Sequence, residues 1–323
     1  MNFIRKRIIE YLIVLAVVVN LDFILPRIAP GNAAEILITG YANPGLQQQL
    51  LAQKFGLNQS IYVQYVDYLR NIFLTWPPNF GISFQYYPAT VDSLIAQRFW
   101  WTILLIVVSL IVSVLIAYGM AGISSLRRGG KGELASTYSS ILLQATPVYW
   151  TGLVLIWVFA VTLHWFPVFG KVDVNATSTL SYISSVIWHG VLPVVALAGS
   201  LLGENYLILR GTTQEVLRSD YVNAASLRGL RQRVIARSYI LRNSLLPLVS
   251  LLTFSLAGLI SRAVLVEAVF GYAGLGDLLV DGIFYHDYPV LQGTLFVLTV
   301  IILVGGFIGD LVLVRLDPRL RKS

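Results

Sequence analysis

Long apolar stretches separated by shorter polar ones dominate the hydrophobic pattern of this chain. A helix needs about 20 mostly apolar residues to cross the hydrocarbon core of a membrane. Six segments meet this length: 8–28, 99–123, 135–165, 186–209, 245–269 and 289–314. The pattern therefore predicts an all-α polytopic membrane protein with about six transmembrane helices.

The basic residues assign these six segments to one topology. Seventeen of the 23 Lys and Arg residues lie before the first segment, after the last, or in the second and fourth of the five connections. Six crossings place all of these regions on one side. Because Lys and Arg accumulate in cytoplasmic loops, both termini are predicted to be cytoplasmic.

The same pattern divides the chain into three parts. These are an N-terminal tail and first helix at 1–28, a long extracytoplasmic loop at 29–98, and a core at 99–323 that holds the other five helices. Within the loop, 47–55 is predicted to form a short amphipathic helix. The first segment also has the basic start of a cleaved signal peptide. However, its apolar run is long for one, and its removal would leave an odd number of helices.

Composition supports a membrane protein and excludes several other classes. Only 12% of the residues are charged, whereas soluble domains carry about 25%. The net charge of +7 follows from the cytoplasmic loops, so no nucleic-acid partner is predicted. Cysteine is absent, which excludes disulfides and thiolate metal sites. The three histidines, His164, His189 and His286, are far apart in sequence, so no metal site is predicted.

Motifs for catalysis are also missing, so the chain is predicted not to be an enzyme. The nucleotide-binding pattern G-x-x-x-x-G-K-[ST] and the hydrolase patterns H-E-x-x-H and G-x-S-x-G do not occur. The string Gly-Leu-Gly-Asp at 274–277 matches the GxGD pattern of membrane aspartyl proteases. That chemistry needs two aspartates facing each other within the membrane, one of which keeps a proton. Asp277 instead falls in a predicted outer loop.

The cytoplasmic loop 211–244 contains a short predicted helix. Ser219 or Asp220 is suited to start it, and Gly229 is suited to end it because glycine tolerates the left-handed conformation. About nine residues at 1.5 Å each give a length of roughly 13 Å. A helix this short is not stable alone. It is therefore expected either to dock in a groove of a partner or to lie with its basic flank on anionic lipid.

Several segments resemble one family. Residues 220–230, with the sequence DYVNAASLRGL, resemble the EAA loop of ATP-binding-cassette (ABC) importer permeases in its dipeptide/oligopeptide variant. The LRNSLLP segment at 241–247 follows it as in that family. Further segments resemble the family in the same order: 25–32, 55–60, 267–276, 287–293 and 317–319. Asn223 departs from the usual glutamate of the loop.

The resemblance implies a type I ABC importer permease fold and a location in the cytoplasmic membrane as a multi-pass subunit. It implies that the chain forms half of a translocation pathway for peptides and that loop 211–244 couples it to cytoplasmic ATPases. The residues that it implies for this coupling are Asp220, Tyr221, Asn223, Ala224, Ala225, Arg228, Gly229 and Arg231.

The implied partners are a second permease subunit in a heterodimer, two ATP-binding-cassette subunits, an extracytoplasmic substrate-binding protein and the lipid bilayer. The chain itself is expected to bind no cofactor, with ATP and Mg on the partner subunits. Oligosaccharides and nickel complexes remain alternative cargoes of the same class. An ion-coupled secondary carrier is the alternative from another class, but it would need an inverted repeat and midplane ion sites.

Polar residues within the predicted spans are candidates for the pathway, because ionisable groups in a bilayer usually face a cavity. These residues are Glu204, Asn205, Arg262 and Glu267. They could line or gate the pathway, or Arg262 could form an internal ion pair with Glu204 or Glu267 that holds helices together. Pro147 and Pro193 are predicted to bend their helices.

Overall fold

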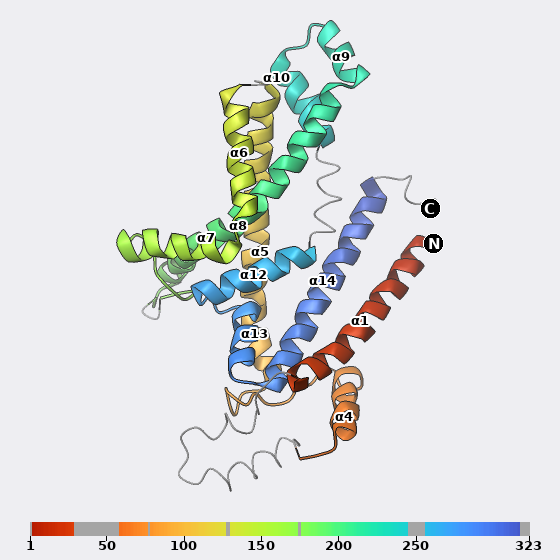
Figure 1. Ribbon diagram of the computed structural model, residues 1–323, viewed down its shortest axis with the longest axis vertical. Helices are drawn as coiled ribbons and strands as arrows, with labels where there is room; N and C mark the ends of the chain where they lie inside the picture. Colours follow the sequence, from red (N-terminus) through yellow and green to blue (C-terminus); the bar gives the residue numbers. More distant parts are fainter. Residues whose placement is uncertain are drawn as a thin grey trace. The chain divides into compact units, whose positions relative to one another are not determined.

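The computed structural model describes residues 2–28, 58–76, 78–126, 130–173, 176–244 and 256–316 (Figure 1). Every named element in these ranges is a helix, with one isolated bridge between Ile82 and Thr90. The all-α prediction is therefore confirmed. The elements are α1 (Asn2–Ile28), α4 (Ile61–Phe73), α5 (Val91–Leu126), α6 (Lys131–Ala145), α7 (Val148–Leu155), the π-helix η1 (Ile156–Thr162), α8 (Thr179–Leu217), α9 (Asp220–Leu227), α10 (Gln232–Val234), the π-helix η2 (Ile235–Leu241), α12 (Leu256–Phe270), α13 (Leu275–Phe284) and α14 (Tyr288–Leu316).

Four of the described helices, α1, α5, α8 and α14, are long and apolar enough to cross a membrane alone. Two bent pairs add further candidate spans. The helix α6 continues into α7 and η1 with a bend of 101°, and α12 continues into α13 with a bend of 71°. Counting each bent pair as one span gives six, which agrees with the number predicted from the hydrophobic pattern.

The predicted third span, 135–165, is broken sharply at Pro147. Proline has no backbone N–H and forces the preceding residue out of the helical conformation. Thr146 accordingly has an extended backbone with φ −84° and ψ 125°, and Pro147 becomes the N-cap of α7. The bend predicted at Pro147 is thus present. Pro193 instead lies inside α8, which continues through it.

Helices also extend into regions predicted as loops. The predicted first outer loop contains α4 and the first turns of α5, and the predicted last outer loop contains α13. At the other end of the core, α8 continues to Leu217 and so occupies the start of loop 211–244. The helix predicted at 47–55 and the first residues of the segment 245–269 lie outside the described residues.

The chain divides into two compact units. One comprises 1–102 and 273–303, and the other comprises 103–272 and 304–323, so α5 and α14 contribute to both. In the first unit, Val19 and Phe23 of α1 are buried against Tyr68 and Ile72 of α4. This small apolar core holds α4 against α1.

Asp287 fastens the loop before α5 to the start of α14 in the same unit. Its carboxylate accepts hydrogen bonds from Ser83 Oγ at 2.5 Å and from the Gln85 backbone N–H at 3.0 Å. It also accepts one from the Val290 N–H at 3.2 Å, which caps α14. Burial raises the pKa of Asp287 above its usual value, and these three donors oppose that rise. The residue therefore has a structural role in this unit.

Arg98 ties α5 to α13 through two carboxylates. Its guanidinium lies 3.0 Å from Asp277 and 3.7 Å from Asp281. The Tyr86 hydroxyl donates to Asp281, and burial together with this bond raises the pKa of Tyr86 to about 12. An arginine thus faces both aspartates, which is unlike the two carboxylates sharing a proton that an aspartyl protease needs.

In the second unit, α6 and α8 pack closely at Gly203. A Cβ atom at this position would lie 2.4 Å from the Ser140 carbonyl oxygen. At Gly199, one turn earlier on α8, the nearest atom to an added Cβ is Leu143 Cδ2 at 3.9 Å, an ordinary contact. The helix pair therefore tolerates a methyl group at one glycine and not at the other.

We expect Gly203→Ala to lower the free energy of unfolding by about 1–3 kcal/mol, because α6 and α8 must move apart. Gly199→Ala is the matched control. It should leave stability unchanged or raise it by up to about 1 kcal/mol, since alanine favours the helix more than glycine does. Thermal unfolding in detergent measures both variants. Equal midpoints would contradict the close α6–α8 contact.

Candidate functional site

The short helix predicted within 211–244 is present as α9, Asp220–Leu227, directly after α8 (Figure 1). The 39 residues of α8 span roughly 58 Å at 1.5 Å per residue, about twice the hydrocarbon core of a bilayer. The surplus length lets α8 extend beyond the membrane and carry α9 at its C-terminal end.

Both ends of α9 use the residues predicted to form them. Ser219 occupies the N-cap position, where its carbonyl oxygen accepts from the Val222 and Asn223 N–H groups. Its hydroxyl does not cap the helix but donates to the Val216 carbonyl at 2.5 Å. At the other end Gly229 has φ +74°, the left-handed conformation that glycine adopts without strain. An added Cβ at Gly229 would meet nothing within 4 Å.

The two faces of α9 differ sharply. Val222 and Ala225 are buried in a cluster with Ile235 and Ile240 of the returning chain. The opposite face is exposed at Asp220, Asn223, Ala224 and Leu227. Leu227 is 88% exposed, so the end of this face presents an apolar side chain to solvent. Of the two adjacent alanines, Ala224 therefore points outward and Ala225 packs on the chain's own core.

The remaining residues of the predicted set lie around this exposed face. Tyr221 is 43% exposed and its hydroxyl accepts from Asn243 Nδ2 at 3.3 Å. Arg228 and Arg231 are exposed and follow α9 directly. All eight predicted coupling residues thus belong to one short segment, and Ala225 alone among them is buried.

The chain after α9 returns to α8 and is fastened there. Ser244 is fully buried, and its hydroxyl accepts from Thr213 Oγ1 at 3.3 Å and donates to the Ile240 carbonyl at 2.9 Å. Leu241 packs into a buried cluster with Tyr206 and Leu209 of α8. The segment is therefore attached to α8 both where it starts and where it returns.

Sequence reasoning missed Glu133, which continues this connection to α6. Its carboxylate lies 3.0 Å from the Arg210 guanidinium of α8, and its side chain is 7% exposed. Gln214 Nε2 also donates to it at 3.4 Å. A buried carboxylate with such partners is costly to leave unpaired. Its signal in the sequence was a single acidic residue shortly after the basic residues 127, 128 and 131.

The four predicted pathway residues separate into different environments. Glu204 and Arg262 form the ion pair considered above, at 3.3 Å between α8 and α12 with both side chains about one-third exposed. Asn205 is buried and donates to Ser113 Oγ at 2.8 Å between α8 and α5. Glu267 is fully buried in α12. Asn205 and Glu267 are therefore packed inside the chain, and the Glu204–Arg262 pair is the partly exposed polar feature of this set.

No group of three or more His, Asp or Glu side chains that could hold a metal ion occurs within the described ranges. The three histidines also differ in setting. His164 is exposed with φ +54°, whereas His189 Nδ1 donates to the Ser185 carbonyl at 2.8 Å within α8. These contacts are local ones within a turn or helix.

Comparison with known proteins agrees with this arrangement over the whole chain. Residues 113–322 match the family described as binding-protein-dependent transport system inner membrane component, and residues 1–107 match the N-terminal part of such membrane components. The chain is 31% identical over 317 residues to the oligopeptide transport system permease protein AppB of Bacillus subtilis, covering 98% of both chains. It is 30% identical to the oligopeptide permease protein OppB of Haemophilus influenzae and 29% identical to the dipeptide permease protein DppB of Lactococcus lactis, covering 99% of each chain. This chain therefore belongs to the family of binding-protein-dependent transport system inner membrane components, the permease subunits of ABC importers.

Proposed function

We propose that this chain forms half of the pathway of a peptide importer and that α9 receives the motion of a cytoplasmic ATPase. The observation that carries the proposal is the two-faced α9. One face is buried against η2 and the end of α8, and the other exposes Ala224 and Leu227 to solvent. A short helix that is fixed to its own chain by one face can present the other, with Ala224 and Leu227, to a cleft of a partner.

The contacts around α9 give the proposed coupling a physical route. Motion at α9 reaches α8 through the cluster of Val222 and Ala225 and through the Thr213–Ser244 hydrogen bond. The Arg210–Glu133 ion pair then connects α8 to α6. The transported molecule would meet the helices, whereas ATP and Mg would bind on separate ATPase chains.

The relatives favour peptides as the cargo, because the matched proteins carry oligopeptide or dipeptide transport in their names. Oligosaccharides and nickel complexes remain the alternative cargoes. The partners that the proposal requires are a second permease subunit, two ATPase subunits and an extracytoplasmic substrate-binding protein. The Glu204–Arg262 pair, which links α8 and α12, supports a role in holding these helices together.

Uptake in reconstituted vesicles tests this proposal. We expect labelled trialanine to accumulate only when ATP, the ATPase subunits and the binding protein are all present. Collapse of proton and sodium gradients by ionophores should leave the uptake unchanged. Uptake that follows an ion gradient without ATP would instead identify a secondary carrier. ATP-driven uptake of an oligosaccharide or a nickel complex, but not of trialanine, would overturn the peptide cargo alone.

A further inference from the structure

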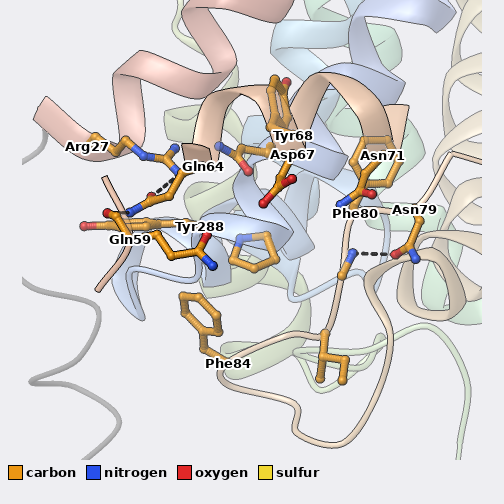
Figure 2. A pocket seen from close by; sticks show the side chains of 14 residues that line it. Arg27, Gln59, Gln64, Asp67, Tyr68, Asn71, Asn79, Phe80, Phe84 and Tyr288 are labelled. Carbon is orange, nitrogen blue, oxygen red and sulfur yellow. Dashed lines mark hydrogen bonds between the residues drawn. The ribbon is translucent and has the colours of Figure 1, made fainter. Parts of the chain in front are cut away.

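A pocket of about 360 Å³ lies in the first unit, and the coupling account does not use it (Figure 2). Its walls come from the end of α1, from α4, from the chain at 79–84 and from the start of α14. The volume is near the lower end of the ~300–1,000 Å³ typical of small-molecule sites. It suits a ligand of about two or three amino-acid residues.

Arg27 provides a fixed positive charge at one end of this pocket. Its guanidinium stacks 3.6 Å from the centre of the Phe23 ring. It donates to the Phe23 carbonyl at 2.8 Å and to Gln64 Oε1 at 3.0 Å, the latter drawn in Figure 2. A guanidinium carries five N–H donors in a planar fork that matches a carboxylate. These two bonds leave donors of Arg27 for a ligand.

Asp67 provides a negative charge on the same pocket wall. It lies on α4 one turn after Gln64, and Figure 2 shows it between Arg27 at one end of the view and Asn79 at the other. Within the described residues, no ion pair joins Asp67 to Arg27, and no hydrogen bond of the Asp67 carboxylate occurs. Two opposite charges therefore face one pocket without neutralising each other.

Carboxamide side chains line the space around these charges. They belong to Gln59, Gln64, Asn71, Asn79 and Gln292. Each carboxamide carries N–H donors and a carbonyl acceptor, which are the two kinds of group that a peptide bond also presents. Gln292 is 8% exposed, and its Nε2 is buried without a hydrogen-bond partner among the described residues. A buried amide donor without a partner is costly unless a ligand completes it.

Aromatic rings complete the walls. The Phe84 and Tyr288 rings lie 6.3 Å apart between centroids, and both line the pocket. The tyrosine ring is also 5.8 Å from the Arg27 guanidinium. Apolar ring faces beside amides and two separated charges are suited to the side chains of a short peptide.

We propose that this pocket binds a short zwitterionic peptide, with its carboxylate on Arg27 and its ammonium on Asp67. The carboxamides that line the pocket pair with the peptide groups of the ligand. A zwitterionic phospholipid headgroup carries the same two charges, but it has no peptide bonds to pair with the amides. The proposal rests on the peptide cargo proposed above and is independent of the coupling role of α9.

Binding of three peptides to the assembled transporter in lipid nanodiscs tests the site, with no binding protein added. The probes are trialanine, its N-acetyl derivative and its C-terminal amide, and binding is measured by saturation-transfer NMR titration. We expect Asp67→Asn and Arg27→Gln each to weaken trialanine binding by on the order of tenfold or more. Asp67→Asn should not further weaken binding of the acetylated peptide, which lacks the ammonium group. Arg27→Gln should not further weaken binding of the amide, which lacks the carboxylate. Arg70→Gln, an exposed arginine on α4 outside the pocket, is the matched control and should bind like the wild type.

Asp67→Asn keeps the test decisive if Arg27→Gln fails to fold, because Asp67 is exposed. Absence of trialanine binding to the wild type at millimolar concentration would overturn the proposal. Equal weakening of all three peptides by either variant would also overturn it. So would an effect of Arg27→Gln on retained phosphatidylethanolamine with no effect on trialanine. If wild-type vesicles still take up trialanine with ATP in any of these cases, the transport proposal stands and the pocket proposal alone fails.

Discussion

Leu227→Asp is expected to reduce ATP-driven uptake by on the order of thirtyfold or more. The side chain is 88% exposed at the end of α9, so its apolar surface contributes little to the stability of this chain. In the proposed complex the leucine is a hot-spot residue buried in the ATPase cleft, and replacing a hot-spot residue costs about 2 kcal/mol or more. A carboxylate there would also be buried without a partner. Uptake by reconstituted vesicles and co-purification of the ATPase subunits both measure the effect.

Leu227→Met is the matched control, because it keeps an apolar side chain of similar volume. It should retain uptake within about threefold of the wild type. Both variants should reach the membrane in equal amounts and unfold at the same temperature as the wild type. If Leu227→Asp retained the ATPase subunits and wild-type uptake, the exposed face of α9 would not be the docking surface.

Gly229→Val is expected to bring peptide-stimulated ATPase activity and uptake close to background while leaving membrane insertion intact. Gly229 holds φ +74°, where a side chain costs about 1–2 kcal/mol and a β-branched one is a clear outlier. No atom lies within 4 Å of an added Cβ, so the conflict arises from the backbone and not from crowding within this chain. Valine would therefore change the path of the chain that leaves α9 and displace Arg231.

Gly229→Asn separates the effect of backbone conformation from that of an added side chain, because asparagine adopts the left-handed conformation more readily than valine. We expect this variant to keep most of the uptake. Thermal unfolding should show whether either variant alters the fold. Wild-type uptake and ATPase stimulation in Gly229→Val would contradict the coupling role of this turn.

The hydrophobic pattern predicted the number of spans well, because a sufficiently long run of apolar residues is the main requirement for crossing a bilayer. The limits of α14 and the end of α1 lie close to the predicted ones, whereas α8 continues beyond its predicted segment at both ends. The short helix α9 was predictable for a different reason, since Ser219 and Gly229 mark its ends by their local conformational preferences. The conformational preferences that end a helix depend only on residues close to that end. They can therefore be recognised in a single sequence.

The bends and short outer helices were less predictable. Pro147 signalled a break, yet the 101° angle depends on how α6 and α7 pack on α8. The helix α4 has a mixed surface, and its register is set by contacts of Tyr68 and Ile72 with α1, far away in sequence. Short helices such as α4 depend on tertiary packing for their stability.

The sequence predicted which segment forms the candidate site. It did not predict which residues of that segment are buried and which are exposed. Ala224 and Ala225 are identical in type and adjacent, so only the packing of Ile235 and Ile240 decides which one is buried. The Glu133–Arg210 pair joins residues 77 positions apart. The Glu204–Arg262 pair was considered from residue type, and its geometry became visible only with α8 and α12 side by side.

Site-specific photo-crosslinking tests the central claim, that the exposed face of α9 docks on an ATPase subunit. The chain contains no cysteine, so Ala224→Cys and Ala225→Cys each introduce one labelling position for benzophenone maleimide. In inside-out vesicles of the assembled transporter, the account predicts a crosslink to the ATPase subunit from position 224 and little or none from position 225. A crosslink from position 225 alone, or none from position 224 in an assembly that still transports peptide, would contradict it.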